Sequence, residues 1–339
     1  MKVGVLTAGG DCPGLNAAIR GVVARLAAED VEVVGIRNGW RGLIEGIASP
    51  LTRDDVRGIL HAGGTILGTS RMDPYVHGLG FESVRTTVDD LDIDVLVVIG
   101  GDGSLRTASR LHGEGLSVVG IPKTIDNDIP GTDVTFGFHT AVQIVTDAID
   151  RLTTTAESHN RIMLVEVMGR TAGWIAAYAG MAGGAEAILV PEIPYDLATL
   201  GERLKSRHRT GHDYSIVVIA EGTPGPEGKE STQGVDAFGF DRLGGVANQV
   251  AEQLEELTGY ETRVTTLGYL QRGGTPTAYD RILATRLGVR AAELVMEGQS
   301  GVMAALRGDS IVPVDLEEAC RRPRPLEPER YREAAWFFA

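Results

Sequence analysis

The stretch VLVVIGGDGS, residues 95–104, is the best guide to the fold class. Its first five residues are apolar and mostly β-branched, which is typical of a strand buried on both faces. The glycines, aspartate and serine that follow are typical of a tight turn. Strands buried on both faces belong in parallel sheets covered by helices, and such sheets bind ligands beyond the carboxyl ends of their strands. We therefore expect an α/β fold with its chemistry in strand-to-helix turns.

Further short apolar runs repeat this pattern, with helical segments between them. They are Val3–Thr7, Val31–Ile36, Val118–Ile121, Ile162–Val167, Ala187–Val190, Ser215–Ala220 and Val264–Leu270. The 45 glycines have no collagen-like period and indicate many tight turns. Because 339 residues exceed the size at which one hydrophobic core usually stops growing, we expect two compact lobes.

Composition excludes several classes of function. The chain has 46 acidic and 32 basic residues, which gives a net charge of -14. This negative charge argues against a nucleic-acid partner. The two cysteines, Cys12 and Cys320, fit neither a disulfide framework nor a metal site, and the N-terminus lacks a signal-peptide pattern, so we expect a cytoplasmic protein. The longest apolar tract, Ala172–Val190, contains Glu186 and several glycines. It predicts a buried helix, a turn and a strand, with no membrane partner.

Two glycine-rich loops follow predicted strands. The first, Ala8–Asn16, precedes a helical run at Ala17–Ala28 and can present backbone N–H groups to a phosphate, although a plain strand-to-helix turn explains it equally well. It matches neither the G-x-G-x-x-G nor the Walker pattern. In the second loop, Gly100–Ser104, Asp102 supplies a hard oxygen ligand for Mg²⁺ bridging phosphates, against the alternative of a capping Asp. Two such loops in one chain favour a polyphosphate ligand.

A third element, PKTIDND at residues 122–128, again follows a strand. Phosphoryl transfer to an alcohol needs a group that accepts the hydroxyl proton, and a carboxylate suits that role. A lone D-x-D pattern is usually a turn or a helix cap. Asp126 and Asp128 follow a predicted strand, as the two glycine-rich loops do, and this shared position favours a catalytic role for them.

Cations for a phosphorylated ligand must be held locally because the net charge is negative. Arginines stand at strand ends, where their planar guanidinium can bind phosphate in a bidentate manner, although any one of them is by default a surface residue. They are Arg161, Arg170, Arg263 and Arg272, and Arg71 lies in the segment GTSRMDP.

Two remaining segments carry no clear chemistry. The stretch Gly222–Gly245 reads as an exposed excursion between two strands, either a lid or plain surface. The tail beyond Val312 is expected to end in a short helix whose Trp336, Phe337 and Phe338 pack on a lobe or on a neighbouring subunit.

The motifs, taken together, resemble the 6-phosphofructokinase family. They are TAGGDCPGLNAAIRG, IGGDGS, PKTIDND, SHNRIMLVEVMGRTAGW and LGYLQRGG, in the family's order, and with the Glu221 segment they cover the chain from Lys2 to about Arg290. The resemblance implies two doubly wound, mostly parallel sheets flanked by helices. It also implies a phosphoryl-donor lobe, residues 1–137 plus about 271–321, and a fructose 6-phosphate lobe, about 138–270 plus 322–339. A homotetramer or homodimer with active sites completed across a subunit boundary is expected.

The same resemblance implies a role for each matched residue. Asp126 would be the base that activates the 1-hydroxyl of the sugar, Asp102 would hold Mg²⁺, and Arg170 would stabilise the transferring group. The remaining implied residues fall into three sets: Thr124 and Asp128 beside the catalytic centre; Met168, Gly169, Glu221, Tyr269 and Arg272 around fructose 6-phosphate, with Arg161 and Arg263 from a neighbouring subunit; and Gly10, Arg71, Met72, Gly101, Gly103, Ser104 and Lys123 around the donor.

Departures from the family pattern bear on regulation and on the donor. Tyr269 replaces a common histidine, and Thr210–Asp213 lacks the lysines of an effector pocket, so control by ADP or phosphoenolpyruvate is not expected. Gly103 stands where pyrophosphate-using relatives commonly carry Asp, which favours ATP; Lys123 resembles a residue that those relatives use to grip pyrophosphate, which keeps that donor as the alternative. A dehydrogenase and a non-catalytic sugar-phosphate sensor remain as remote alternatives.

Overall fold

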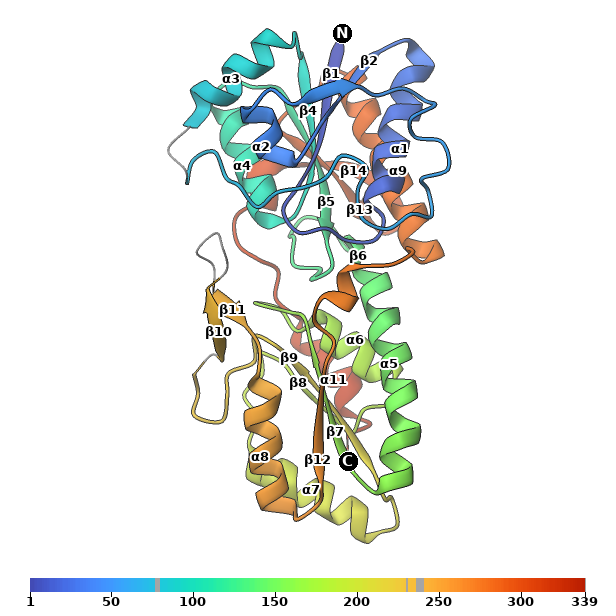
Figure 1. Ribbon diagram of the computed structural model, residues 1–339, viewed down its shortest axis with the longest axis vertical. Coiled ribbons are helices and arrows are strands. Elements are labelled where there is room, and N and C mark those ends of the chain that lie inside the picture. Colours follow the sequence, from blue (N-terminus) through green and yellow to red (C-terminus); the bar gives the residue numbers. More distant parts are fainter. Residues whose placement is uncertain (77–79, 230, 236–240, 339) are drawn as a thin grey trace. The chain divides into compact units, whose positions relative to one another are not determined.

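The computed structural model describes residues 1–76, 80–229, 231–235 and 241–338. The chain folds into two compact units, which Figure 1 shows in ribbon form. Unit 1 comprises Met1–Ile125, Ile129–Thr140 and Arg272–Pro323, and unit 2 comprises Asp126–Asp128, Ala141–Gln271 and Arg324–Ala339. Each unit has its own sheet and its own hydrophobic core.

The sheet of unit 1 has the strand order β14-β13-β5-β4-β1-β2-β3. Its neighbouring strands are parallel except for the edge pairs β2-β3 and β13-β14, and β6 pairs with β5. The strands are β1 (Lys2–Ala8), β2 (Glu32–Ile36), β3 (Ala48–Pro50), β4 (Val95–Gly100), β5 (Val118–Thr124), β6 (Phe136–Gly137), β13 (Val302–Arg307) and β14 (Ser310–Asp315).

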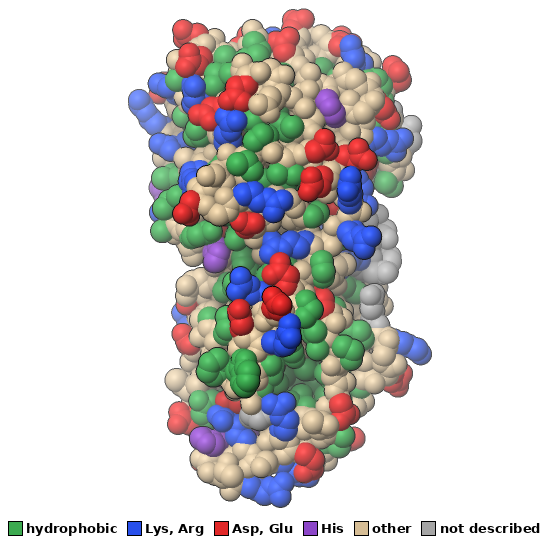
Figure 2. Space-filling model, turned by 180° about the vertical axis from the view of Figure 1, so that it is seen from behind, with side chains coloured by type: hydrophobic (Ala, Val, Ile, Leu, Met, Phe, Trp, Pro, Cys, Tyr) green, Lys and Arg blue, Asp and Glu red, His purple; other side chains and the backbone are tan. Residues whose placement is uncertain are grey.

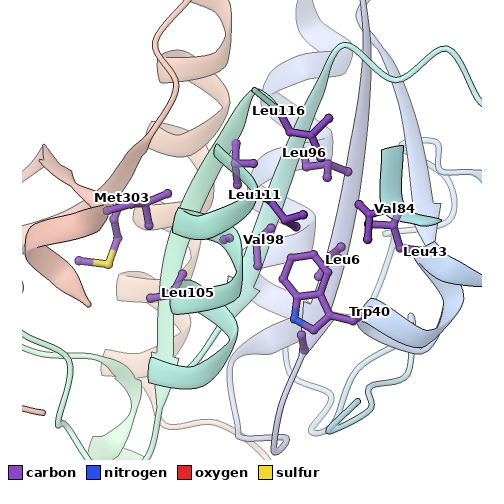
Figure 3. Packing of buried hydrophobic residues seen from close by; sticks show 14 of the residues in the cluster. Leu6, Trp40, Leu43, Val84, Leu96, Val98, Leu105, Leu111, Leu116 and Met303 are labelled. Carbon is purple, nitrogen blue, oxygen red and sulfur yellow. The ribbon is translucent and has the colours of Figure 1, made fainter. Parts of the chain in front are cut away.

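Helices cover both faces of this sheet (Figure 1). They are α1 (Leu15–Leu26), followed by the 3-10 turn η1 (Ala27–Glu29), α2 (Gly39–Ile44), α3 (Gly80–Asp90), α4 (Asp102–Gly113), α9 (Ala278–Met296) and α10 (Leu316–Ala319). A Cβ added at Gly288 would lie 2.3 Å from the carbonyl oxygen of Ala18, so this glycine allows α9 to pack directly on α1. On the other face, Trp40, Leu43 and Leu105 fill the core with side chains from the sheet (Figure 3).

Unit 2 contains a four-stranded, fully parallel sheet in the order β12-β7-β9-β8. Its strands are β7 (Ile162–Val167), β8 (Ala187–Leu189), β9 (Ser215–Ala220) and β12 (Thr262–Thr266). Its other elements are α5 (Phe138–His159), whose first three residues belong to unit 1, α6 (Trp174–Ala182), α7 (Leu197–Arg209), α8 (Val246–Thr258), the 3-10 turn η2 (Gly268–Arg272), α11 (Pro328–Ala335) and the antiparallel pair β10 (Thr232–Val235) and β11 (Asp241–Leu243).

The predicted α/β class with mostly parallel sheets is confirmed. Ala172–Val190 forms α6, a turn and β8, as expected. None of the helices that the structure describes is long and apolar enough to span a bilayer. One strand prediction is wrong at its end: β12 stops at Thr266, because the chain turns into η2 at Gly268, where φ is +45°. The predicted helix at Ala17–Ala28 begins and ends two residues earlier.

The stretch Gly222–Gly245 is not a uniformly exposed excursion. Gly222 and Thr223 are buried, and the Thr223 hydroxyl donates to the carbonyl oxygen of Leu189 at 3.1 Å. The antiparallel strands β10 and β11 form its middle, residues 230 and 236–240 lie outside the described part, and α8 follows directly. The lid prediction stays a prediction.

The aromatic tail is only partly packed within the chain. Phe338 makes an edge contact with Tyr331 of α11, with ring centroids 5.7 Å apart. Trp336 and Phe337 are 85% and 77% exposed, so the expectation that they pack on a lobe of this chain is wrong. Packing on a neighbouring subunit stays a prediction.

Candidate active site

The first loop of unit 1 lies beside the segment that carries Arg71 and Met72. The Gly9 N–H donates to the carbonyl oxygen of Ser70 at 2.9 Å, and the Thr69 hydroxyl donates to the carbonyl oxygen of Gly9 at 2.6 Å. Gly14, the N-cap of α1, has a φ of +106° and no side chain that could cap the helix. The first-turn N–H groups of α1 are therefore left without a side-chain cap, as an anion site requires.

The thiol in this loop is structural. Cys12 is completely buried and donates to the carbonyl oxygen of Phe136 at 3.6 Å. Burial raises the pKa of Cys12 to about 12, and the charge of Lys123 opposes that rise only in part. A neutral, buried thiol is a poor nucleophile, so the loop offers main-chain groups and not a reactive side chain.

The second loop connects β4 to α4 and leaves room at its tip. A Cβ added at Gly103 would meet no atom within 4 Å, whereas one added at Gly100 would lie 2.4 Å from Cβ of Ser104. Gly101 is the N-cap of α4, again without a capping side chain. Asp102 opens the helix, and both of its carboxylate oxygens accept hydrogen bonds from Nη2 of Arg106, at 2.8 and 3.0 Å. The loop thus combines open space, first-turn N–H groups and one carboxylate.

The first and second loops and the end of β5 meet at one sheet edge. β1, β4 and β5 are parallel neighbours, with Ala8 opposite Gly100 and Gly100 opposite Pro122. Lys123 is 3% exposed, and its ammonium donates to the carbonyl oxygen of Gly10. A Cβ added at Gly101 would lie 3.3 Å from the carbonyl oxygen of Lys123 and 3.9 Å from Cβ of Thr124. The predicted donor residues of unit 1 are therefore close together.

Arg272, the last residue of η2, belongs to unit 1 and contacts the first loop. Its Nη1 donates to the carbonyl oxygen of Asp11 at 3.3 Å, and a Cβ added at Gly10 would lie 2.5 Å from the same nitrogen. The sequence assigned Arg272 to the sugar phosphate together with Met168 and Glu221, which lie in unit 2. Its buried Nε has no hydrogen-bond partner among the described residues.

The TIDND segment runs from unit 1 into unit 2. Thr124 ends β5, where its carbonyl oxygen accepts from the Thr135 hydroxyl at 2.7 Å, and Asp126–Asp128 belongs to unit 2. Asn127 has a φ of +53°, a left-handed conformation that Asn tolerates better than most residues. The tight turn leaves Asp126 partly exposed and buries Asn127.

In unit 2, the loop after β7 packs against the loop after β9. The Gly222 N–H donates to the carbonyl oxygen of Gly169 at 3.2 Å, and the Glu221 N–H donates to that of Val167 at 2.8 Å. The buried side chain of Gln271 accepts from the Met168 N–H at 3.1 Å. These contacts bring Met168, Gly169, Arg170 and Glu221 together, with the Arg170 side chain exposed.

Arg161 and Arg263 lie at the opposite end of the same sheet. Glu261 accepts from Arg161 at 2.6 and 3.0 Å and also from Arg263. The two guanidinium groups lower the pKa of Glu261, first through the Arg161 hydrogen bond. The six residues of β7 separate Arg161 from Met168 by roughly 20 Å of strand. Within one chain these arginines therefore do not join Gly169, and Tyr269 of η2 is 72% exposed.

Two buried carboxylates, which accept hydrogen bonds from main-chain N–H groups at the first turns of helices, were not predicted from the sequence. Glu166 inside β7 accepts from the N–H groups of Gly245 and Ala247 at 2.9 and 3.0 Å, at the start of α8. Asp280 of α9 accepts from the N–H and hydroxyl of Thr140, at 2.7 and 2.6 Å, at the start of α5. Burial raises the pKa of Asp280, and the Thr140 hydrogen bonds oppose this. An acid in an otherwise apolar strand was the available signal for Glu166.

Surface charge is mixed on the face that Figure 2 shows. Acidic and basic side chains are intermingled there, and basic residues do not form a continuous stripe. This agrees with the net charge of -14 in disfavouring a long polyanion as ligand. A small phosphorylated ligand would depend on local groups such as Lys123.

Comparisons with known proteins agree with this geometry. Residues 2–295 match the family model described as Phosphofructokinase. The chain is 53% identical over 341 residues to a pyrophosphate–fructose 6-phosphate 1-phosphotransferase of Amycolatopsis methanolica, covering all of both chains. It is 50% identical over 337 residues to ATP-dependent 6-phosphofructokinase 3 of Streptomyces coelicolor, covering 98% of this chain and 99% of that one.

Solved structures give the same result. The phosphofructokinase of Pichia pastoris in the T-state superposes with a TM-score of 0.83 at 34% identity over 94% of this chain. The chain spans only 35% of that longer protein. A pyrophosphate-dependent phosphofructokinase from Marinobacter aquaeolei superposes with a TM-score of 0.82 at 25% identity, covering 100% of this chain and 92% of that one. With its motifs, sheets and loops in this arrangement, the chain belongs to the phosphofructokinase family.

Proposed function

We propose that this protein transfers the terminal phosphoryl group of ATP to the 1-hydroxyl of fructose 6-phosphate, giving fructose 1,6-bisphosphate and ADP, a step of glycolysis. The observation that carries the proposal is the meeting of the Gly9–Gly10 loop, the Gly101–Ser104 loop and Lys123 at one sheet edge of unit 1. Family membership supports it.

Unit 1 would bind the donor through main-chain groups. The uncapped first turns of α1 and α4 offer N–H groups and the positive end of the helix dipole to phosphate oxygens. Gly10, Gly101 and Ser104 line this edge, and Arg71 and Met72 follow the segment hydrogen-bonded to Gly9. Because a Cβ at Gly103 would meet no atom within 4 Å, this position leaves room for the part of a nucleotide that extends past the loop.

Asp102 is the residue in this donor site that suits Mg²⁺. Its carboxylate is a hard oxygen ligand beside the proposed phosphate position, and phosphate oxygens and water would complete the shell. The bound ion would neutralise charge on the phosphates. In the described structure Arg106 occupies this carboxylate, so Arg106 must release it when the ion binds.

Unit 2 would bind the sugar phosphate and supply the base. Asp126 would accept the proton of the 1-hydroxyl as the new phosphorus–oxygen bond forms. Arg170 would stabilise charge on the transferring group, with Thr124 and Asp128 supporting the centre. Met168, Gly169, Glu221 and Tyr269 of unit 2 would contact the sugar phosphate, as would Arg272 of unit 1.

Arg161 and Arg263 would complete the site of a neighbouring subunit. Both guanidinium groups form ion pairs with Glu261 at the far end of the sheet. From there they would contribute to the sugar-phosphate site of another copy of the chain. This supports a homotetramer or homodimer. A cytoplasmic location fits the two free cysteines, of which Cys12 is buried.

Pyrophosphate is the alternative donor. The ammonium of Lys123, which donates to the carbonyl oxygen of Gly10, would bind a small diphosphate in this alternative. The name of the Amycolatopsis methanolica relative points to the same donor. We favour ATP because the space at Gly103 is what a nucleotide requires, whereas an additional lysine does not exclude one.

The test is a donor assay with purified protein, Mg²⁺ and fructose 6-phosphate, with ATP and pyrophosphate supplied separately. Bisphosphate formation with ATP is expected. Formation with pyrophosphate alone would overturn the donor assignment, and formation with neither would overturn the proposed function. Addition of EDTA, with excess Mg²⁺ as the rescue, should abolish and then restore activity.

A further inference from the structure

The C-terminal segment holds two parts of the proposed catalytic centre within unit 2. Residues 323–326, PRPL, join α10 to α11 and lie outside the residues that match the family model. The Arg324 N–H donates to the carbonyl oxygen of Asp128 at 2.6 Å, which ties the segment to the turn that carries Asp126. A residue remote in sequence thus contacts the proposed base segment.

The same residue also holds the start of α6. The indole Nε1 of Trp174 donates to the carbonyl oxygen of Arg324 at 3.3 Å, and the Arg324 guanidinium carbon lies 4.4 Å from the centroid of the indole ring. Trp174 is 1% exposed and directly follows the loop 168–173, which carries Arg170. Arg324 therefore contacts Trp174 through both its backbone and its side chain.

A second anchor fixes the segment next to this loop. Glu192 accepts from the Leu326 N–H at 2.7 Å and from the Gly173 N–H at 3.0 Å. Gly173 is the N-cap of α6. One carboxylate thus links the tail to the end of loop 168–173, two residues beyond the Arg324 anchor.

Two prolines restrict the backbone conformation of this segment. Proline rings at positions 323 and 325 flank Arg324. A residue that precedes proline is restricted to extended conformations, which limits the alternatives open to the chain before it docks. The N–H and carbonyl of Arg324 are therefore presented at low entropic cost.

We propose that Arg324 is a positioning residue: it fixes the turn that carries Asp126 relative to the loop that carries Arg170. The proposal rests on the proposed function, since it needs both residues to act on one transferring group. A general base must reach its proton within hydrogen-bonding distance, and a displacement of about 1 Å can cost on the order of 100-fold in rate. Arg324 acts through its neighbours and does not touch substrate.

The test compares Arg324→Ala with Arg322→Ala, an exposed arginine two residues away in the same segment. Arg324→Ala keeps the main-chain bonds to Asp128 and Trp174 and removes the guanidinium group that clamps the segment on the indole. We expect this loosening to lower kcat by about 10-fold to 100-fold, with the KM for ATP changed by less than about 2-fold. Arg324→Lys keeps the charge but loses the planar face that stacks on the indole, so intermediate activity is expected. Arg322→Ala should match the unmodified protein.

A second readout does not depend on activity. In the Trp40→Phe/Trp336→Phe background Trp174 is the remaining tryptophan, so acrylamide quenching reports its exposure directly. Arg324→Ala should raise the quenching constant of Trp174 by about 2-fold or more because the cation–π contact and its cover are lost. Arg322→Ala should leave it unchanged.

Several outcomes would overturn the proposal. Equal kcat for Arg324→Ala and Arg322→Ala would do so, and so would a kcat loss without greater exposure of Trp174. If Arg324→Ala does not fold, Arg324→Lys decides by the same two measurements. A chain inactive with either donor would refute the proposed function, and the quenching experiment would still decide whether Arg324 covers Trp174.

Discussion

Glycines have opposite roles in the loop after β4 and in the two packed loops after β7 and β9. A Cβ at Gly103 would enter open space, whereas a Cβ at Gly222, which packs on the β7 loop, would lie 1.9 Å from the carbonyl oxygen of Arg170. Gly169 in the β7 loop also has a φ of +137°, a backbone conformation that favours glycine. The loop after β4 leaves open space at Gly103, which the proposed function assigns to the donor. The loops after β7 and β9 are packed closely so that their side chains are held in place.

This contrast predicts different consequences for the same kind of substitution. A side chain at the open position should change ligand binding and leave folding intact. A side chain at the packed position should change folding, and activity only as a result. The sequence alone cannot distinguish an open glycine position from a packed one, because the difference lies in the neighbouring atoms and not in the residue type.

The largest expected effect is that of Gly103→Asp on donor use. The carboxylate would fill the open space and repel the nucleotide's phosphates, so kcat/KM for ATP should fall by on the order of 100-fold to 1000-fold. Steady-state kinetics and a melting curve measure the two properties. Gly113→Ala, at the other open end of α4, is the control. A large fall in Tm for Gly103→Asp would contradict the finding that a side chain at this position meets open space.

Gly222→Ala should destabilise the protein by about 2–3 kcal/mol or more, because the β9 loop must move away from Arg170. Urea unfolding gives the change in the free energy of unfolding. Gly103→Ala is the matched control and should change it by less than about 1 kcal/mol. Equal stability of the two variants would show that loop packing in unit 2 has no special role.

Glu166→Gln should cost about 1–3 kcal/mol of folding free energy. The carboxylate is 2% exposed and accepts main-chain N–H groups at the start of α8, and an amide is a weaker acceptor that also buries an extra donor. Chemical unfolding monitored by far-UV circular dichroism measures the change. Exposed Glu256→Gln in α8 is the control, and an equally small effect of both substitutions would contradict this role.

The smallest expected effect is a pH dependence of stability from the buried His208 and the half-buried His139. Burial lowers the pKa of His208 in unit 2 and of His139 in unit 1. Below the unfolded value of about 6.5, the unfolded chain therefore takes up a proton before the folded chain does, and stability falls with falling pH. Melting curves between pH 8 and pH 5 should show a shallower fall for His208→Gln and for His139→Gln. An unchanged slope in both variants would contradict the assignment.

Much of the fold could be predicted because buried strands leave a clear signature. Ile162–Val167 and Ser215–Ala220 were predicted with the observed bounds, since short runs dominated by apolar and β-branched residues are typical of buried strands. The end of β12 was missed because LGYL is as apolar as a strand, while the left-handed φ of Gly268 depends on tertiary context. The motif residues of the candidate site could be named in advance, although their roles stay predictions. Arg324 and Glu192 could not be named, because their partners Asp128, Gly173 and Trp174 are far away in sequence.

The most direct measurement of the central claim is the turnover of Asp126→Ser, with fructose 6-phosphate binding measured by calorimetry on the same protein. If the chain catalyses phosphoryl transfer with Asp126 as base, kcat should fall by on the order of 1000-fold while the affinity for fructose 6-phosphate stays within a few-fold. Unchanged turnover in a folded Asp126→Ser variant would contradict it.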